Sequence, residues 1–218
     1  MNPNAKELRP QPFTIGGQPA WTFDALPAVG TPAPDFHLAD AQFKDWTLAD
    51  FAGTRLLLNI VPSLDTPVCS LSARKFNADA AARPNLKVLT ISADLPFAQA
   101  RFCESLKAPN GLFLSTFRSP EFGMDYGTLI VDHALMGLQA RAVVAIGADG
   151  TVLHSHLVPE MTNEPDYSAA WAAIDAAGAE YLQPLSRFSF SRLPPHFPLT
   201  FPPARVKSLP QINRDISS

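Results

Sequence analysis

Residues 62–69 bring a cysteine thiol to the start of a predicted helix. The preceding run 56–61 is apolar but for one asparagine and predicts a strand buried on both faces. Thr66 followed by Pro67 is typical of a helix N-cap and first helical position. Cys69 then lies in the first turn, where free backbone N–H groups and the helix dipole favour its thiolate. We therefore expect a nucleophile at a strand-to-helix turn, where open α/β sheets place their chemistry.

Composition narrows the class of protein. The chain has 218 residues, and an apolar fraction of 46% is enough for a core. A net charge of −3 with no run of Lys or Arg argues against nucleic-acid binding. The longest apolar stretches are of strand length, so we expect no membrane span. The first residues lack the apolar stretch of an export signal, and we expect a cytoplasmic location.

The two cysteines, Cys69 and Cys103, do not form a C-x-x-C motif. They are either inert core thiols or a reactive pair. They lie on different predicted helices, so the sequence does not reveal their separation. A disulfide needs Cα atoms within roughly 7 Å. If the helices hold the sulfurs farther apart, the turn at 66–69 must unwind when the bond forms.

The order of predicted elements indicates an α/β protein with a thioredoxin-like fold, in which helices flank a central mixed sheet. An N-terminal β-hairpin is expected at 13–23, with a turn at Gly16 and Gly17. Strands are predicted at 55–61, 86–92, 112–114, 141–146 and 152–158, and helices at 67–82, from 94–96 through Cys103, at 121–126 and at 165–182.

Three regions of the chain are expected. Residues 1–12 form a flexible segment, residues 13–183 form the domain, and residues 184–218 form a proline-rich extension. The prolines exclude a long helix or central strand in the extension, which is nevertheless rich in Phe and Leu. Either it is an extended arm laid over its own body or a partner subunit, or it is a disordered tail.

Several segments resemble the bacterial thiol peroxidases, a branch of the atypical two-cysteine peroxiredoxins. Pro62-x-x-x-Thr66-x-x-Cys69 is the general peroxiredoxin pattern, and the segment ending at Cys103 is characteristic of this branch. The similarity covers about residues 13 to 182. The matching segments are 62–69, 92–103 and 137–142, with shorter matches at 75–77, 115–118 and 164–167.

This resemblance implies a thioredoxin fold and a peroxidase without metal or prosthetic group. Cys69 would be the peroxidatic cysteine and Cys103 the resolving one, joined as an intramolecular disulfide after peroxide has reacted. Thioredoxin would be the reductant, a hydroperoxide the substrate, and the protein a homodimer.

Three further residues have expected roles at this site. Arg141 would lie in a strand near Cys69 and stabilise the thiolate and the charge on the peroxide oxygens; otherwise it is an exposed strand-end arginine. As N-cap, the Thr66 oxygen would accept a backbone N–H, which leaves its hydroxyl hydrogen for the peroxide. Pro62 would shield the pocket and fix the turn.

If the substrate pocket beside Cys69 has an apolar wall, it would favour alkyl hydroperoxides over hydrogen peroxide. Each of its candidate residues belongs to a type that is more often plain core. The candidates are Leu64, Phe97, Met136 and Leu138.

Three functions are compatible with the sequence. The first two need a reactive Cys69, and the third does not. The first is a thioredoxin-dependent peroxidase acting in antioxidant defence. The second is a redox sensor or binding protein that oxidises once and signals to a partner. The third is a structural domain with inert thiols. The set Pro62, Thr66, Cys69 and Arg141 favours turnover, because a one-shot sensor has less need for groups that position peroxide.

Overall fold

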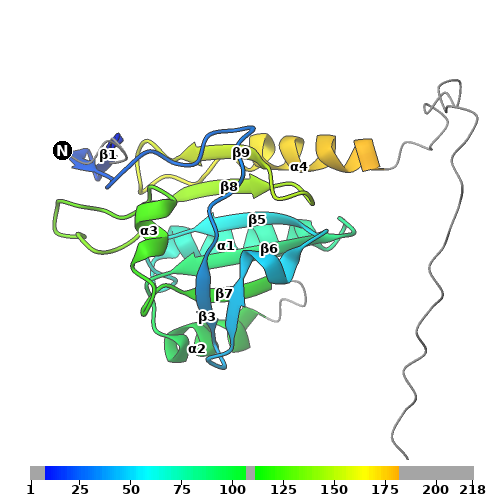
Figure 1. Ribbon diagram of the computed structural model, residues 1–218. Helices are drawn as coiled ribbons and strands as arrows, with labels where there is room; N and C mark the ends of the chain where they lie inside the picture. The colour runs from blue at the N-terminus through cyan, green and yellow to red at the C-terminus, as the bar shows by residue number, and fades with distance from the viewer. Residues whose placement is uncertain (1–7, 107–110, 182–218) are drawn as a thin grey trace, which may run out of the picture. The chain divides into compact units, whose positions relative to one another are not determined.

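A mixed sheet of seven strands forms the centre of the computed structural model, which describes residues 8–106 and 111–181 (Figure 1). The strand order is β4-β3-β7-β6-β5-β8-β9; β5, β6 and β7 are parallel, and the outer strands pair antiparallel. The strands are β3 (His37–Asp40), β4 (Asp45–Thr47), β5 (Arg55–Ile60), β6 (Leu86–Ser92), β7 (Gly111–Ser115), β8 (Ala142–Ile146) and β9 (Val152–Leu157).

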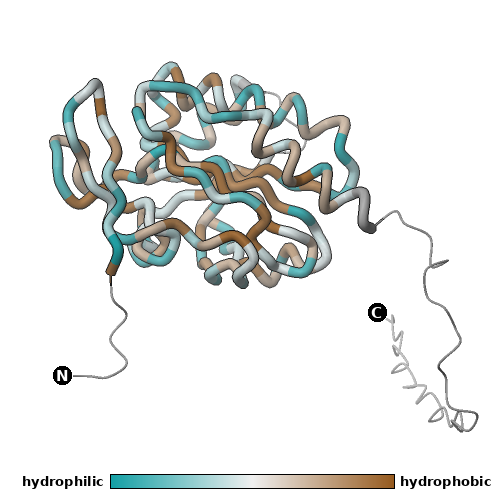
Figure 2. The backbone as a smooth tube through the Cα atoms, turned by 90° about the horizontal axis from the view of Figure 1, so that it is seen from above, coloured by the Kyte–Doolittle hydropathy of each residue, from teal (hydrophilic) through white to brown (hydrophobic). Residues whose placement is uncertain are grey.

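Helices cover both faces of the sheet. One face carries α1 (Pro67–Ala80), α2 (Pro96–Leu106) and α4 (Tyr167–Tyr181), whereas α3 (Glu121–Asp125) and the short 3-10 helix η1 (Leu48–Phe51) pack on the other. The apolar residues concentrate in the strands between these layers (Figure 2). The predicted thioredoxin-like fold with a mixed sheet is confirmed.

Side chains of β5 alternate between the two faces. Leu56, Leu58 and Ile60 join the core cluster of α3 and η1, while Leu57 joins that of α1 and α4. The asparagine that interrupts the apolar run is itself fully buried. A strand with both faces covered needs apolar residues at successive positions, which explains the run seen in the sequence.

The pairing of β5 with β8 places Arg141 beside the residues that follow β5. The two strands run antiparallel, with Ile60 opposite Ala142. The end of β5, where the chain turns toward α1, therefore meets the start of β8. Arg141 directly precedes β8, so the register alone brings its backbone to the turn that carries Cys69.

The N-terminal hairpin forms as predicted, with β1 (Pro12–Ile15) and β2 (Gln18–Trp21) paired in a separate sheet. Its two turn residues, Gly16 and Gly17, have φ of 57° and 78°, a backbone region that favours glycine. The side chain of Phe13 packs into a cluster with Met161, so the hairpin is fixed to the segment after β9.

Helix ends differ from the sequence predictions by about two residues. The first helix ends at Ala80 rather than 82. The last helix begins at Tyr167 rather than 165, because Asp166 accepts hydrogen bonds from the first turn of that helix. Of the segment 1–12, residues 1–7 lie outside the described residues, as does the extension 184–218. In the described ranges, no helix combines the length and apolar composition needed to cross a bilayer.

Candidate active site

Cys69 lies at the predicted place, as the third residue of α1, and its side chain is fully buried. Two polar groups approach its sulfur. The Thr66 hydroxyl oxygen is 2.7 Å from Sγ, and Arg141 Nη2 is 3.4 Å from it. A hydroxyl and a guanidinium directed at one sulfur form a site for the thiolate rather than for a neutral core thiol.

Thr66 caps α1 through its backbone and uses its side chain differently from the prediction. Its backbone is extended, with φ −97° and ψ 144°, as an N-cap requires, and Pro67 follows at the first helical position. The side chain makes no capping hydrogen bond. The expectation that its oxygen accepts a backbone N–H is therefore wrong. Its hydroxyl instead lies within hydrogen-bonding distance of Cys69 Sγ and, at 3.1 Å, of the Ser63 carbonyl.

The guanidinium of Arg141 is almost fully buried, at 2% exposure. Its Nε donates to the Met161 carbonyl at 2.9 Å, and Nη2 points at Cys69. The third nitrogen, Nη1, is buried and has no hydrogen-bond partner among the described residues. Because a buried cation with an unused donor is costly, this arrangement favours an anion or an oxygen acceptor beside the sulfur.

Glu160 holds the segment that orients Arg141. Its carboxylate accepts hydrogen bonds from the Thr14 and Thr162 hydroxyls and from three backbone N–H groups, including those of Gly16 and Gly17. Met161, whose carbonyl binds Arg141, is the next residue and donates its own N–H to the Thr14 carbonyl. The N-terminal hairpin therefore supports the guanidinium through this loop.

Replacing Glu160 with Gln is expected to loosen the hairpin at neutral pH, because an amide cannot accept all five bonds. These bonds hold the pKa of Glu160 far below its ordinary value of 4.5. A depressed folded-state pKa gives stability that is present above 4.5 and is lost as pH falls through the folded value. Thermal unfolding from pH 7 to pH 3 should thus show a difference between wild type and E160Q that shrinks on acidification. The control is E121Q. A difference in melting temperature between wild type and E160Q that does not change with pH, or an equal difference for E121Q, would contradict this.

Cys103 lies on α2 and is half-buried. It packs, with Phe102, against a cluster of buried residues that contains Cys69, so the fold brings the two cysteines to one apolar cluster. Both thiols are free. Burial, aided by the nearby charge of Glu104, raises the pKa of Cys103 to about 11. This thiol is therefore protonated at neutral pH.

Alkylation of Cys103 in a Cys69→Ser variant tests this environment. The rate with iodoacetamide should remain low at pH 7 to 8 and rise up to about pH 11, because the thiolate is the reacting form. In urea the same thiol should titrate near its ordinary value of about 8.5. A folded-state midpoint equal to the one in urea would contradict the burial effect.

Pro62 is buried two residues after the end of β5, and the two residues that follow it are held by Asp94. The Ser63 hydroxyl and the Leu64 N–H each donate to the Asp94 carboxylate at 2.7 Å. Asp94 is a residue that sequence reasoning missed. Its place in a polar turn directly before a predicted helix is the signal that was available, but such a turn has many other uses.

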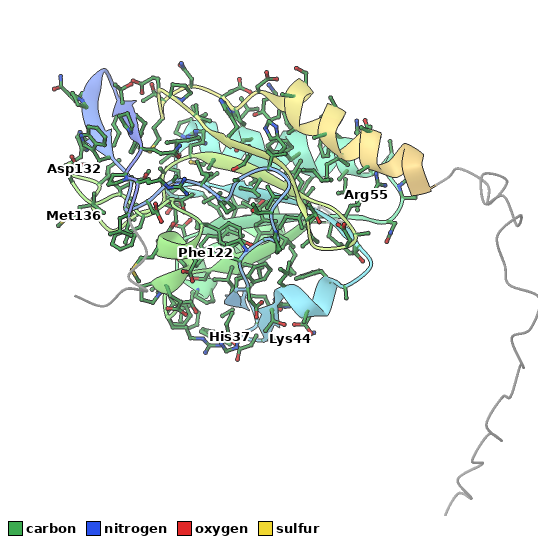
Figure 3. All side chains as sticks on the ribbon, turned by 45° about the horizontal axis from the view of Figure 1, so that its top comes forward. His37, Lys44, Arg55, Phe122, Asp132 and Met136 are labelled. Carbon is green, nitrogen blue, oxygen red and sulfur yellow. The ribbon has the colours of Figure 1, made fainter. Side chains whose placement is uncertain are left out.

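The four residues expected to form an apolar wall lie in three different surroundings. Leu64 is buried in the cluster of Cys69, and it is the one member of the set there. Phe97 is 64% exposed and lies with its ring 5.1 Å from that of Phe43. Met136 is 69% exposed and lies at the end of the molecule that also carries Asp132 (Figure 3), whereas Leu138 packs against the cluster of the N-terminal hairpin.

Comparison with known proteins places this site in a family. The Redoxin profile matches residues 28–171, a range that includes β5 and the Cys69 turn and ends within α4. The chain belongs to the Redoxin family. Thiol peroxidase of Mycobacterium tuberculosis is 48% identical to this chain over 164 residues, which cover 75% of this chain and 98% of the relative.

Solved structures of Redoxin-like proteins agree with this assignment. A peroxiredoxin-like protein from Aquifex aeolicus is 34% identical, with a TM-score of 0.73, and the match covers 78% of this chain and 99% of that one. A thiol peroxidase from Chromobacterium violaceum is 26% identical, with a TM-score of 0.72 and coverage of 78% and 98%. The resemblance to thiol peroxidases is confirmed, and the protein is a thiol-dependent peroxidase of the peroxiredoxin type.

Proposed function

We propose that the protein reduces alkyl hydroperoxides and hydrogen peroxide with Cys69 as the peroxidatic and Cys103 as the resolving cysteine. The observation that carries this proposal is the buried Cys69 sulfur held between the Thr66 hydroxyl and the Arg141 guanidinium. This arrangement fits thiolate chemistry at an oxygen–oxygen bond. Relatives named thiol peroxidases support the same reaction.

In the first step the Cys69 thiolate attacks the terminal oxygen of the peroxide. A sulfur–oxygen bond forms and the oxygen–oxygen bond breaks, which leaves a sulfenic acid. The departing oxygen takes a proton and leaves as alcohol or water. Arg141 stabilises the thiolate, and its unpartnered Nη1 is available to the oxygen on which charge develops. The Thr66 hydroxyl donates to the sulfur or, during attack, to the peroxide.

In the second step the sulfur of Cys103 attacks the sulfur of the Cys69 sulfenic acid. A disulfide forms, the sulfur–oxygen bond breaks, and the hydroxyl group leaves with the thiol proton as water. Cys69 is fully buried in the first turn of α1, where the Ser70 N–H donates to the Thr66 carbonyl at 3.0 Å. We infer that this turn opens when the sulfurs bond.

A thioredoxin-type dithiol then returns the enzyme to its reduced form. Its two thiols are oxidised to a disulfide while the bond between Cys69 and Cys103 is reduced. We also infer a homodimer and a cytoplasmic setting, where thioredoxin keeps such thiols reduced. Contacts of the alkyl group with Leu64, Phe97, Met136 and Leu138 stay a prediction.

The single-oxidation sensor is the second candidate, and a steady-state assay separates the two. Reduced protein is mixed with cumene hydroperoxide, thioredoxin, thioredoxin reductase and NADPH, and NADPH consumption is followed. The peroxidase predicts many turnovers in wild type, none in Cys69→Ser, and impaired thioredoxin-coupled turnover in Cys103→Ser. Consumption of a single equivalent of peroxide by wild type, in the presence of reductant, would establish the sensor instead.

A further inference from the structure

The carboxylate of Asp94 joins the two chain segments that carry the cysteines. One oxygen accepts the Ser63 hydroxyl at 2.7 Å, and the other accepts the Leu64 N–H at 2.7 Å and the Ser92 hydroxyl at 2.8 Å. Ser63 and Leu64 belong to the loop before α1. Asp94 itself lies two residues before α2, the helix of Cys103.

The Asp94 side of this connection is fixed to the sheet. The Ser115 hydroxyl, at the end of β7, donates to the Asp94 carbonyl at 2.5 Å. Gln99, which is fully buried on α2, donates to the Ser92 hydroxyl oxygen at 3.1 Å and to the Leu114 carbonyl at 2.9 Å. The start of α2 is thus the fixed part, and the loop before α1 is the part that Asp94 holds.

The loop held by Asp94 determines where Cys69 and Thr66 lie. The Ser63 carbonyl lies 3.1 Å from the Thr66 hydroxyl and also accepts the Thr66 N–H. The Leu64 side chain is buried in the cluster that contains Cys69 and against which Cys103 packs. Loss of the two bonds from Ser63 and Leu64 would therefore release the residues that aim the Thr66 hydroxyl at the sulfur.

We propose that Asp94 is a positioning residue that holds the loop at 63–66 in its peroxide-reactive arrangement and thereby sets the balance between disulfide formation and overoxidation of Cys69. This inference rests on the proposed function. A held loop speeds the first step and delays the unwinding that the disulfide requires. The delay gives a second peroxide time to react with the sulfenic acid.

The two fates of the sulfenic acid consume different reactants. Attack by Cys103 forms the disulfide and releases water. Attack by the sulfenate on a second hydroperoxide forms another sulfur–oxygen bond, breaks the oxygen–oxygen bond and releases an alcohol, which leaves a sulfinic acid. The ratio of disulfide to sulfinic acid at a fixed peroxide concentration therefore compares the rate of disulfide formation, which includes the opening of the turn, with the rate at which the sulfenic acid reacts with peroxide.

Asp94→Asn should move the two steps in opposite directions. The amide retains the size of the side chain, but its NH₂ group cannot accept the bonds that an oxygen accepts. We expect oxidation of Cys69 to slow by about three- to tenfold and the ratio of disulfide to sulfinic acid to rise by a similar factor, as for the loss of charge-assisted bonds. Ser63→Ala removes one of these bonds and should produce a smaller change in the same directions.

The experiment uses the full chain, reduced and mixed with cumene hydroperoxide in a quench-flow instrument, with Cys69 products identified by mass spectrometry. Asp149→Asn is the charge control. Its carboxylate accepts bonds from Thr151 in the hairpin between β8 and β9, and the strand register places this hairpin at the opposite end of β5 from Cys69. This variant should match wild type in both steps.

Each outcome has one meaning. Slower oxidation with a higher disulfide fraction supports the role of Asp94. Unchanged steps, or a lower disulfide fraction together with a lower melting temperature, overturn it in favour of a purely structural role. If Asp94→Asn does not fold, the same criteria apply to Ser63→Ala. Wild type that forms no disulfide between Cys69 and Cys103 would overturn the proposed function itself, independently of both variants.

Discussion

Replacing Arg141 with Met is expected to slow the oxidation of Cys69 by peroxide about 100- to 1,000-fold, the usual cost of removing a donor aimed at developing charge. The buried guanidinium has Nη2 3.4 Å from the sulfur and a further nitrogen without a partner. Methionine fills similar space without a charge, so neither the thiolate nor the departing oxygen is stabilised. Stopped-flow measurement of the second-order rate constant with cumene hydroperoxide gives the result.

Arg141→Lys is the matched control, because it retains the charge. An ammonium cannot reproduce the fork that binds the Met161 carbonyl and the sulfur together. We expect its rate to fall between those of wild type and R141M. Equal rates for all three proteins, with unchanged melting temperatures, would show that the guanidinium does not act on the reaction.

The largest effect on stability is expected for Phe76→Ala, a loss of about 3–5 kcal/mol in the free energy of unfolding. Phe76 lies on α1 and is fully buried. Its ring is 4.8 Å from that of Tyr167 and 5.4 Å from that of Trp171, both on α4. Truncation leaves a cavity between the two helices and the sheet. Urea unfolding followed by circular dichroism measures the loss.

Phe76→Leu retains most of the buried volume and should cost clearly less than the alanine variant. The two variants also test whether packing of the body of α1 affects the first turn, where Cys69 lies. Because Phe76 lies two helical turns after Cys69, peroxide reactivity of the folded fraction should change little in the leucine variant. A loss below 1 kcal/mol for F76A would show that the interface between α1 and α4 contributes little.

The sequence predicted those parts of the fold that depend on neighbouring residues. The run at 56–61, the Thr66–Pro67 helix start and the hairpin turn at Gly16 and Gly17 are local signals, and each element formed where it was expected. The place of Arg141 near Cys69 was also expected. An arginine at the start of an apolar strand is unusual unless it has a partner, but the pattern alone left an exposed strand-end arginine open, and the resemblance to thiol peroxidases decided between the two.

The supports of the site depend on distant residues, which a local pattern cannot reveal. The carboxylate of Asp94 binds residues 31 and 30 positions away, and Glu160 binds the Thr14 hydroxyl across 146 positions. The role of Thr66 was misjudged for a related reason. A capping threonine normally bonds the backbone, but here the sulfur three residues along competes for its hydroxyl.

Arg141 and Met161 lie far after Cys69 in the sequence, and this separation has a consequence during protein synthesis. A ribosome adds residues from the N-terminus at about 5–20 per second, so several seconds separate the appearance of Cys69 from that of Arg141 and Met161. During this interval the nascent chain carries its cysteine without the guanidinium or the carbonyl that orients it. A chain released before residue 161 would therefore carry the cysteine of the proposed reaction without the groups that we expect to accelerate it.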